Sequence, residues 1–191
     1  MEQSDATAVA QVRAGNYDAF GVLVERHSRN LFRLAFRMTG NEQDAEDIVQ
    51  ETFMKAYRQL AKFDRRASFS TWLYRIAANG SLDLIRSRNR RQEQQEPAME
   101  EGQELASSVS AGDPTPERLA FSVELKNLLA PALEQLSPME RAAFVLRHYE
   151  GLSTEDIGQA LGVQAGAAKH SVFRAVQKLR RALEPLVSTA R

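Results

Sequence analysis

The chain has 191 residues, of which 43% are hydrophobic and 26% are charged, as is ordinary for a globular protein that folds in water. It contains no cysteine, which excludes disulfides, thiolate metal sites and cysteine nucleophiles. The first residues do not resemble a signal peptide and no apolar run reaches membrane-spanning length, so we expect a cytoplasmic protein with no membrane insertion.

The formal net charge is zero, but acids and bases are segregated along the chain. Residues 41–51 contain acidic side chains and no basic one, and the same holds for residues 92–117. Between them, residues 65–91 are rich in arginine and have Asp83 as the lone acid. Blocks of opposite charge indicate several surfaces with different partners. The neutral total predicts weak long-range attraction of the free chain to DNA.

The apolar spacing of the first part predicts three helices. Asn16 is placed to cap the first, which ends at Gly40, and Asn41 and Asp44 mark the start of a second that continues to Leu60. After a break at residues 62–68, Ser70 is expected to cap a third helix over residues 71–88. This part is expected to form an N-terminal helical domain over residues 1–91.

Residues 92–115 have few apolar side chains and are rich in Glu, Gln and Ser, so they predict a flexible acidic linker. Helical spacing resumes near Pro116 and opens a C-terminal domain over residues 116–191, in which Pro131 should kink or end the first helix. Ser137, Pro138 and Glu140 then form a capping box with proline at the first helical position. No strand pattern is present, so the predicted fold class is all-α, with two small helical domains.

Residues 152–183 predict a helix-turn-helix. Ser153 can cap its first helix, and Gly162 lies where the turn needs a residue that accepts positive φ. In the second helix Val172, Val176, Leu179 and Leu183 form one apolar stripe. Residues on the other side and its flank could contact phosphates and base edges of a duplex: Lys169, His170, Phe173, Arg174 and Gln177. The alternative is a solvated amphipathic helix with a basic last turn.

A second candidate surface lies near residues 63–86, where aromatic and cationic side chains alternate. Rings that stack on bases beside cations that follow phosphates suit single-stranded nucleic acid, and an amide can pair with an extruded base. The candidates are Phe63, Arg65, Arg66, Phe69, Trp72, Arg75, Asn79 and Arg86. The alternative is that Phe69, Trp72 and Tyr74 belong to the core, and we expect this for at least one of them.

The segments DAEDIVQETFMKAYRQLAKFD, FSTWLYRIAANGSLDLIR and LSTEDIGQALGV…KHSVFRAVQKLR, in this order, resemble a bacterial RNA polymerase sigma factor of the extracytoplasmic-function (ECF) group of the sigma-70 family. The resemblance covers nearly the whole chain. It implies docking of Asp47, Gln50 and Glu51 on the clamp coiled coil of the largest subunit of core RNA polymerase, with a further contact at the flap. The linker would thread toward the active-site cleft and the RNA exit path.

The same resemblance implies what the two candidate surfaces would bind. The loop from Phe63 to Phe69, with Asn79, would capture a flipped base of the −10 promoter element and help to open the duplex. The helix from Gln164 to Leu183 would enter the major groove of the −35 element, with Lys169, His170, Phe173 and Arg174 at the contact positions. An anti-sigma factor would hold the protein inactive. Recognition helices of this family commonly have a sequence like GTVKSR, whereas this chain has GAAKHS at residues 166–171, so the promoter sequence cannot be transferred.

Two other classes of function fit the sequence less well than a sigma factor does. A stand-alone helix-turn-helix regulator would need an N-terminal module with a pocket for a ligand or a dimer interface, which the acidic helix and aromatic strip do not suggest. An enzyme acting on nucleic acid would need clustered carboxylates for a metal, or a nucleophile beside a base, and no such constellation is apparent. We therefore expect a non-enzyme with no cofactor and no metal.

Overall fold

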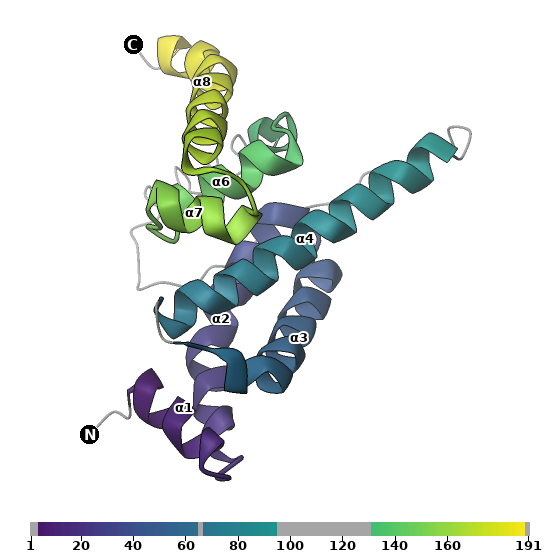
Figure 1. The fold of residues 1–191 in the computed structure, drawn as a ribbon. Coiled ribbons are helices and arrows are strands. Elements are labelled where there is room, and N and C mark those ends of the chain that lie inside the picture. Colours follow the sequence, from purple (N-terminus) through teal and green to yellow (C-terminus); the bar gives the residue numbers. More distant parts are fainter. Residues whose placement is uncertain (1–3, 65–66, 95–130, 190–191) are drawn as a thin grey trace, which may run out of the picture.

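The computed structural model describes residues 4–64, 67–94 and 131–189, and within these ranges every regular element is helical (Figure 1). The all-α fold class is thereby confirmed. The N-terminal half contains α1 (Asp5–Arg13), α2 (Ala19–Thr39), α3 (Glu42–Gln59), the short 3-10 helix η1 (Leu60–Lys62) and α4 (Phe69–Gln94). The C-terminal half contains α6 (Pro138–His148), α7 (Thr154–Leu161) and α8 (Ala165–Thr189), preceded by helical residues 131–134.

Most of the predicted linker lies outside the described residues, as does the predicted helix restart near Pro116. Helix α4 continues to Gln94, three residues beyond the expected end of the first domain at residue 91. The domain boundaries themselves stay predictions.

Three helix starts differ from expectation. The N-terminal helix α1 was not predicted; the Ser4 hydroxyl caps it by accepting the Thr7 amide at 3.2 Å. Asn16 was the wrong cap, because α2 begins at Ala19 and has no side-chain cap at Asp18. Ser70 was also wrong, because Ser68 Oγ accepts the Thr71 amide at 3.1 Å. Beginning α4 earlier places Phe69 on its buried side.

Four other local signals are confirmed. Asn41 Oδ1 accepts the Asp44 amide at 2.9 Å at the start of α3, and Ser137 and Glu140 form the predicted capping box of α6. Ser153 caps α7, and Gly162 ends it with a φ of 67° in the left-handed region. These side-chain and backbone bonds fix where α3, α6 and α7 begin and where α7 ends.

The core joins the two halves. In the N-terminal half α2, α3 and α4 pack around fully buried side chains such as Leu31, Leu34 and Leu73. Helices α6 and α7 lie against α2 and α4, so Leu146 and Ile157 belong to the same hydrophobic cluster. Figure 1 shows α4 running diagonally between the two halves, with α8 projecting away from it. Within the described ranges, no helix is long and apolar enough to cross a membrane.

Candidate nucleic-acid interfaces and docking face

The helix-turn-helix presents one polar face to solvent. Ala168, Ala175 and Leu179 of α8 are buried, and Val172 packs against the core beside them. The inner face is therefore rotated slightly from the predicted stripe, because Val176 and Leu183 are only half-buried. All five side chains predicted to contact the duplex are exposed: Lys169, His170, Phe173, Arg174 and Gln177.

Phe173 stands out on this face because its side chain is 61% exposed. An exposed ring of this size has no role in the core, and it can contact a thymine methyl group in a major groove. Lys178, one residue beyond Gln177, is also exposed, but its ammonium pairs with Glu140 at 2.6 Å. That ion pair ties α8 to the start of α6 and withdraws one cation from the polar face.

The predicted docking residues Asp47, Gln50 and Glu51 all lie on the exposed side of α3. Glu51 pairs with Lys55 at 3.0 Å, four residues on, so part of its charge is balanced at the surface. Next to them Met54 is 52% exposed and Tyr57 43% exposed.

Tyr57 lies at the edge of this exposed side of α3. Its ring packs at 5.0 Å from Phe20 and 6.3 Å from the 66% exposed Tyr17. The acidic face therefore continues into an apolar shoulder of Tyr17, Met54 and Tyr57. The one signal for this shoulder in the sequence is the position of Met54, which helical periodicity places on the outer face of α3.

The aromatic residues of the second candidate surface are mostly enclosed. Phe63 and Phe69 are buried and Trp72 is half-buried; their ring centroids lie 5.1 to 5.7 Å apart. We name Phe63, Phe69 and Trp72 the aromatic cluster. The expectation that at least one ring belongs to the core is confirmed by Phe69 and Tyr74. The burial of Phe63 was not expected, and it results from these mutual ring contacts.

The cations predicted with this surface have different surroundings. Arg65 and Arg66 lie outside the described residues. Arg75 is half-buried, and Arg86 is exposed with Asp83 at 3.7 Å. Arg88, farther along α4, donates to Asp44 of α3 at 2.7 Å. It therefore neutralises a buried carboxylate and holds α4 to α3.

Asn79 lies where α4 meets α7. Its side-chain Nδ2 donates to the backbone oxygen of Arg75 at 2.8 Å and to that of Ala160 at 2.8 Å. Both N–H groups of Nδ2 are thereby engaged by backbone carbonyls, so the α4–α7 contact occupies the donor side of the amide predicted for base capture.

Further polar contacts join the two halves. The Arg141 guanidinium donates to Met38 O at 3.0 Å, and Arg37 lies 3.9 Å above the centre of the Tyr149 ring. Beside them Tyr74 is hydrogen-bonded to the Glu150 carboxyl. Burial raises the pKa of Glu150, and the Tyr74 hydrogen bond and the charges of Arg37 and Arg33 only partly oppose this shift.

Among the described residues, no three His, Asp or Glu side chains gather in a way that could hold a metal ion. The acids of α3 are spread around the helix, and Asp44 is already paired with Arg88. The arrangement therefore offers surfaces for binding: a polar helix face, an acidic face with an apolar shoulder, and an enclosed aromatic cluster.

The chain matches two protein-family models. Residues 23–91 match Sigma-70 region 2, and residues 126–179 match Sigma-70, region 4. The chain is 35% identical over 187 residues to the ECF RNA polymerase sigma factor SigW of Bacillus subtilis, covering 97% of this chain and 100% of that protein. It is 33% identical over 190 residues to the RNA polymerase sigma-H factor of Pseudomonas aeruginosa, covering 99% and 98%.

Solved structures show the same likeness. The sigma factor RpoE in complex with the anti-sigma factor NepR from Bartonella quintana aligns with a TM-score of 0.68 and 25% identity, over 86% of this chain and 96% of that one. CnrH in complex with the cytosolic domain of CnrY aligns with a TM-score of 0.65 and 29% identity, over 93% and 96%. Both alignments extend over the N-terminal and the C-terminal halves.

Proposed function

This chain belongs to the ECF RNA polymerase sigma factors, a family of transcription initiation factors, and we propose that its two halves divide promoter recognition between them. The C-terminal half binds the −35 element as a duplex, through the exposed face of α8. The observation that carries this assignment is that Lys169, His170, Phe173, Arg174 and Gln177 are all exposed on the second helix of a helix-turn-helix. No core contact competes for these side chains.

The N-terminal half recognises and opens the −10 element. Its surface comprises the aromatic cluster with Arg65, Arg66, Arg75, Asn79 and Arg86. Asn79 bonds to Ala160 O, and the rings of the aromatic cluster are largely enclosed. The N-terminal half must therefore separate from α7 before a base can enter. Binding to polymerase supplies the free energy for that separation.

Core RNA polymerase binds the acidic face of α3. Asp47, Gln50 and Glu51 contact the clamp of the largest subunit, and the C-terminal half contacts the flap. These two attachments set the distance between the promoter-binding surfaces, so two weak DNA contacts act as one strong one. Since its partners are polymerase and promoter DNA, the protein works in the cytoplasm.

An anti-sigma factor controls the chain. The supporting observation is the likeness, over both halves, to a sigma factor bound to an anti-sigma factor. In the present structure the two halves already cover each other's inner surfaces through α4, α6 and α7. A protein that stabilised this arrangement would keep Asn79 hydrogen-bonded to Ala160 O, and the −10 element would therefore not be opened.

Run-off transcription with core polymerase tests the proposal. Promoter-specific transcripts are expected only when the chain is added, and a triple variant with Asp47, Gln50 and Glu51 changed to alanine should lose them together with binding to core. A chain that binds duplex DNA tightly alone and leaves run-off unchanged would instead support the helix-turn-helix regulator.

A further inference from the structure

Helix α1 lies outside the residues that match the Sigma-70 region 2 model, which begin at residue 23, yet it is anchored in the core. Ala8 and Val9 are fully buried, and Val12 is nearly so. Packing of α1 on α2 brings the last residue of α1, Arg13, beside the end of α3 and η1.

Arg13 binds the chain where it leaves α3. The two hydrogens of its Nη2 are shared among Leu60 O at 2.8 Å, Ala61 O at 2.9 Å and Phe63 O at 2.6 Å, and Nε adds a bond to Leu60 O at 3.2 Å. The last carbonyls of a helix have no donors within it, and a planar guanidinium can satisfy several of them at once. Arg13 thus fixes the backbone on both sides of the turn that presents Phe63.

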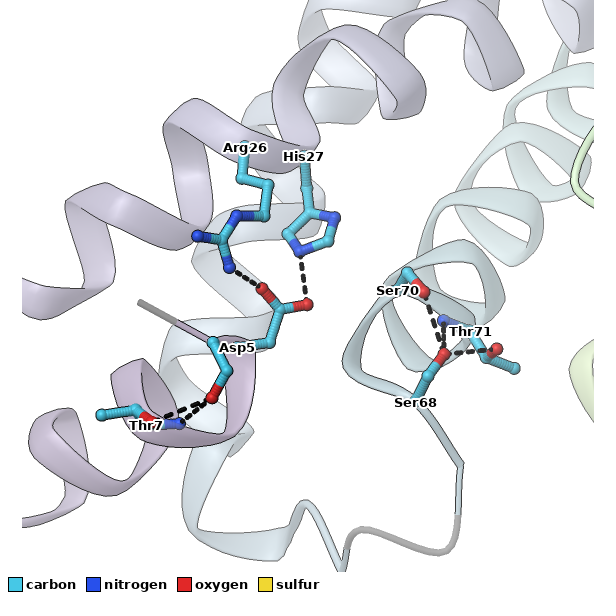
Figure 2. A network of polar contacts seen from close by, with 8 residues as sticks. Asp5, Thr7, Arg26, His27, Ser68, Ser70 and Thr71 are labelled. Atoms are coloured by element: carbon cyan, nitrogen blue, oxygen red, sulfur yellow. Dashed lines mark hydrogen bonds and ion pairs between the residues drawn. The ribbon is translucent and has the colours of Figure 1, made fainter. Parts of the chain in front are cut away.

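The first residue of α1, Asp5, is linked to Phe69 at the start of α4 through residues of α2. Asp5 accepts from Arg26 and lies 2.9 Å from His27 Nε2, as Figure 2 shows. The His27 ring in turn packs 5.6 Å from the ring of Phe69. Across from this network, Figure 2 shows Ser68 capping the first turn of α4 through Thr71.

The aromatic cluster is therefore held from both sides by one short helix. The backbone of Phe63 is bound by Arg13 directly, and Phe69 rests on a histidine that Asp5 orients. A loop whose binding conformation is fixed in advance loses less conformational entropy when it captures its ligand.

We propose that Arg13 is a positioning residue for −10 recognition: through the carbonyls of Leu60, Ala61 and Phe63 it sets the geometry of the aromatic cluster that receives the extruded base. This inference rests on the proposed role of the cluster in strand opening. It assigns to α1 a function in promoter melting, separate from docking on polymerase and from reading of the duplex.

Two variants of the full chain test this role. Arg13→Gln removes the planar guanidinium and its charge. Arg13→Lys keeps the charge, but an ammonium cannot reproduce the four contacts that the guanidinium makes with the backbone carbonyls. Holoenzymes are compared on a promoter that the wild type opens, with a fluorescent base analogue in the −10 element reporting opening. We expect opening to fall about tenfold for Arg13→Gln and less for Arg13→Lys, while core binding and duplex binding stay close to wild type.

A general loss of stability must be separated from this effect. Val145→Ala creates a buried defect in α6, an element that contributes no ring to the aromatic cluster, and the two variants are compared at equal distances below their own thermal midpoints. If Val145→Ala lowers opening as much as Arg13→Gln, or if Arg13→Lys behaves as wild type, the positioning role is overturned.

The only tryptophan of the chain, Trp72, gives a readout that needs no polymerase. In Arg13→Gln its fluorescence should become easier to quench with acrylamide, at a temperature where circular dichroism shows intact helices. Unchanged quenching would refute the inference. If wild-type holoenzyme opens no promoter, the proposed function fails, whereas the Trp72 readout still decides whether Arg13 orders the cluster.

Discussion

Asn79 is engaged in this structure, and the proposed opening of the −10 element requires its release. Its amide is exposed to solvent on one side and donates to Ala160 O on the other. The hydrogen bond costs little to break, because each partner can bond to water afterwards. Release of Asn79 is therefore compatible with a modest driving force from polymerase binding.

We expect Asn79→Ala to impair strand opening and to leave duplex binding nearly intact. The reason is that the variant loses a group able to pair with an extruded base, whereas α8 is unchanged. Holoenzyme opening, followed by permanganate reactivity of −10 thymines, is compared with binding to a −35 duplex. Equal losses in both assays would contradict separate roles for the two halves.

Arg174→Ala should produce the opposite pattern. Arg174 is exposed on α8, and loss of a bidentate contact to a guanine costs roughly 1–3 kcal/mol of duplex binding. The measurement is a gel-shift titration of holoenzyme on the duplex element at several salt concentrations.

Arg180 provides a control for Arg174, because it is an exposed arginine of the same helix that lies about two turns beyond Phe173, past the predicted contact residues. Arg180→Ala should weaken binding slightly and equally on all sequences. If both variants lose the same affinity on specific and random DNA, Arg174 contacts phosphate and not a base.

At the scale of elements, two glycines within helices have opposite surroundings. A Cβ on Gly158 of α7 would meet Val163 O at 2.8 Å and Ala165 N at 3.2 Å, both backbone atoms of the helix-turn-helix turn. A Cβ on Gly80 of α4 would meet nothing within 4 Å. Close packing therefore requires glycine at position 158, whereas position 80 has room for a larger side chain.

Gly80→Ala should raise the free energy of unfolding by about 0.5 to 1 kcal/mol, because alanine loses less backbone entropy in a helix. Gly158→Ala should lower it by about 1 to 3 kcal/mol, because the turn must move away from α7. Urea denaturation of both variants checks the signs. Stabilisation by Gly158→Ala would show that the turn yields to the added methyl group without cost.

Elements set by local chemistry could be predicted, and those set by distant contacts could not. The caps at Asn41, Ser137 and Ser153 bond to amides three residues on, so each signal lies within one short sequence window. Arg13, in contrast, bonds to carbonyls 47 to 50 residues away, and nothing near it in the sequence marks those partners.

The same distinction applies to the candidate sites. The polar face of α8 follows from helical periodicity, so its five exposed residues could be assigned before the structure was known. The enclosure of Phe63 and the engagement of Asn79 depend on how α4 meets other elements, which periodicity does not specify. The DNA contacts of these residues stay predictions.

At the scale of the whole molecule, the contact between the halves contains an ionisable group. Glu150, in the connection between α6 and α7, is hydrogen-bonded to Tyr74 of α4 and faces Arg33 and Arg37 of α2. Burial raises the pKa of the Tyr74 phenol, and the nearby Glu150 charge adds to that shift, so the phenol remains a proton donor to the carboxyl. Protonation of Glu150 removes a buried charge from this contact.

The pKa of Glu150 is raised above its ordinary value of 4.5, so the folded state binds this proton more tightly than the unfolded state. Its contribution to stability is therefore complete below about pH 4.5 and is lost as pH rises through the higher folded pKa. Glu150→Gln keeps an acceptor for Tyr74 but cannot ionise. The variant should gain stability relative to wild type as pH increases across this window.

Urea unfolding of both proteins between about pH 4 and pH 8 measures that difference. Glu155→Gln provides a control of opposite sign, because a hydrogen bond from its own backbone amide, with another from Thr154, lowers the pKa of Glu155 at the start of α7. That variant should lose stability relative to wild type as pH rises. If Glu150→Gln and wild type have parallel profiles, burial of Glu150 does not couple protonation to the contact between the halves.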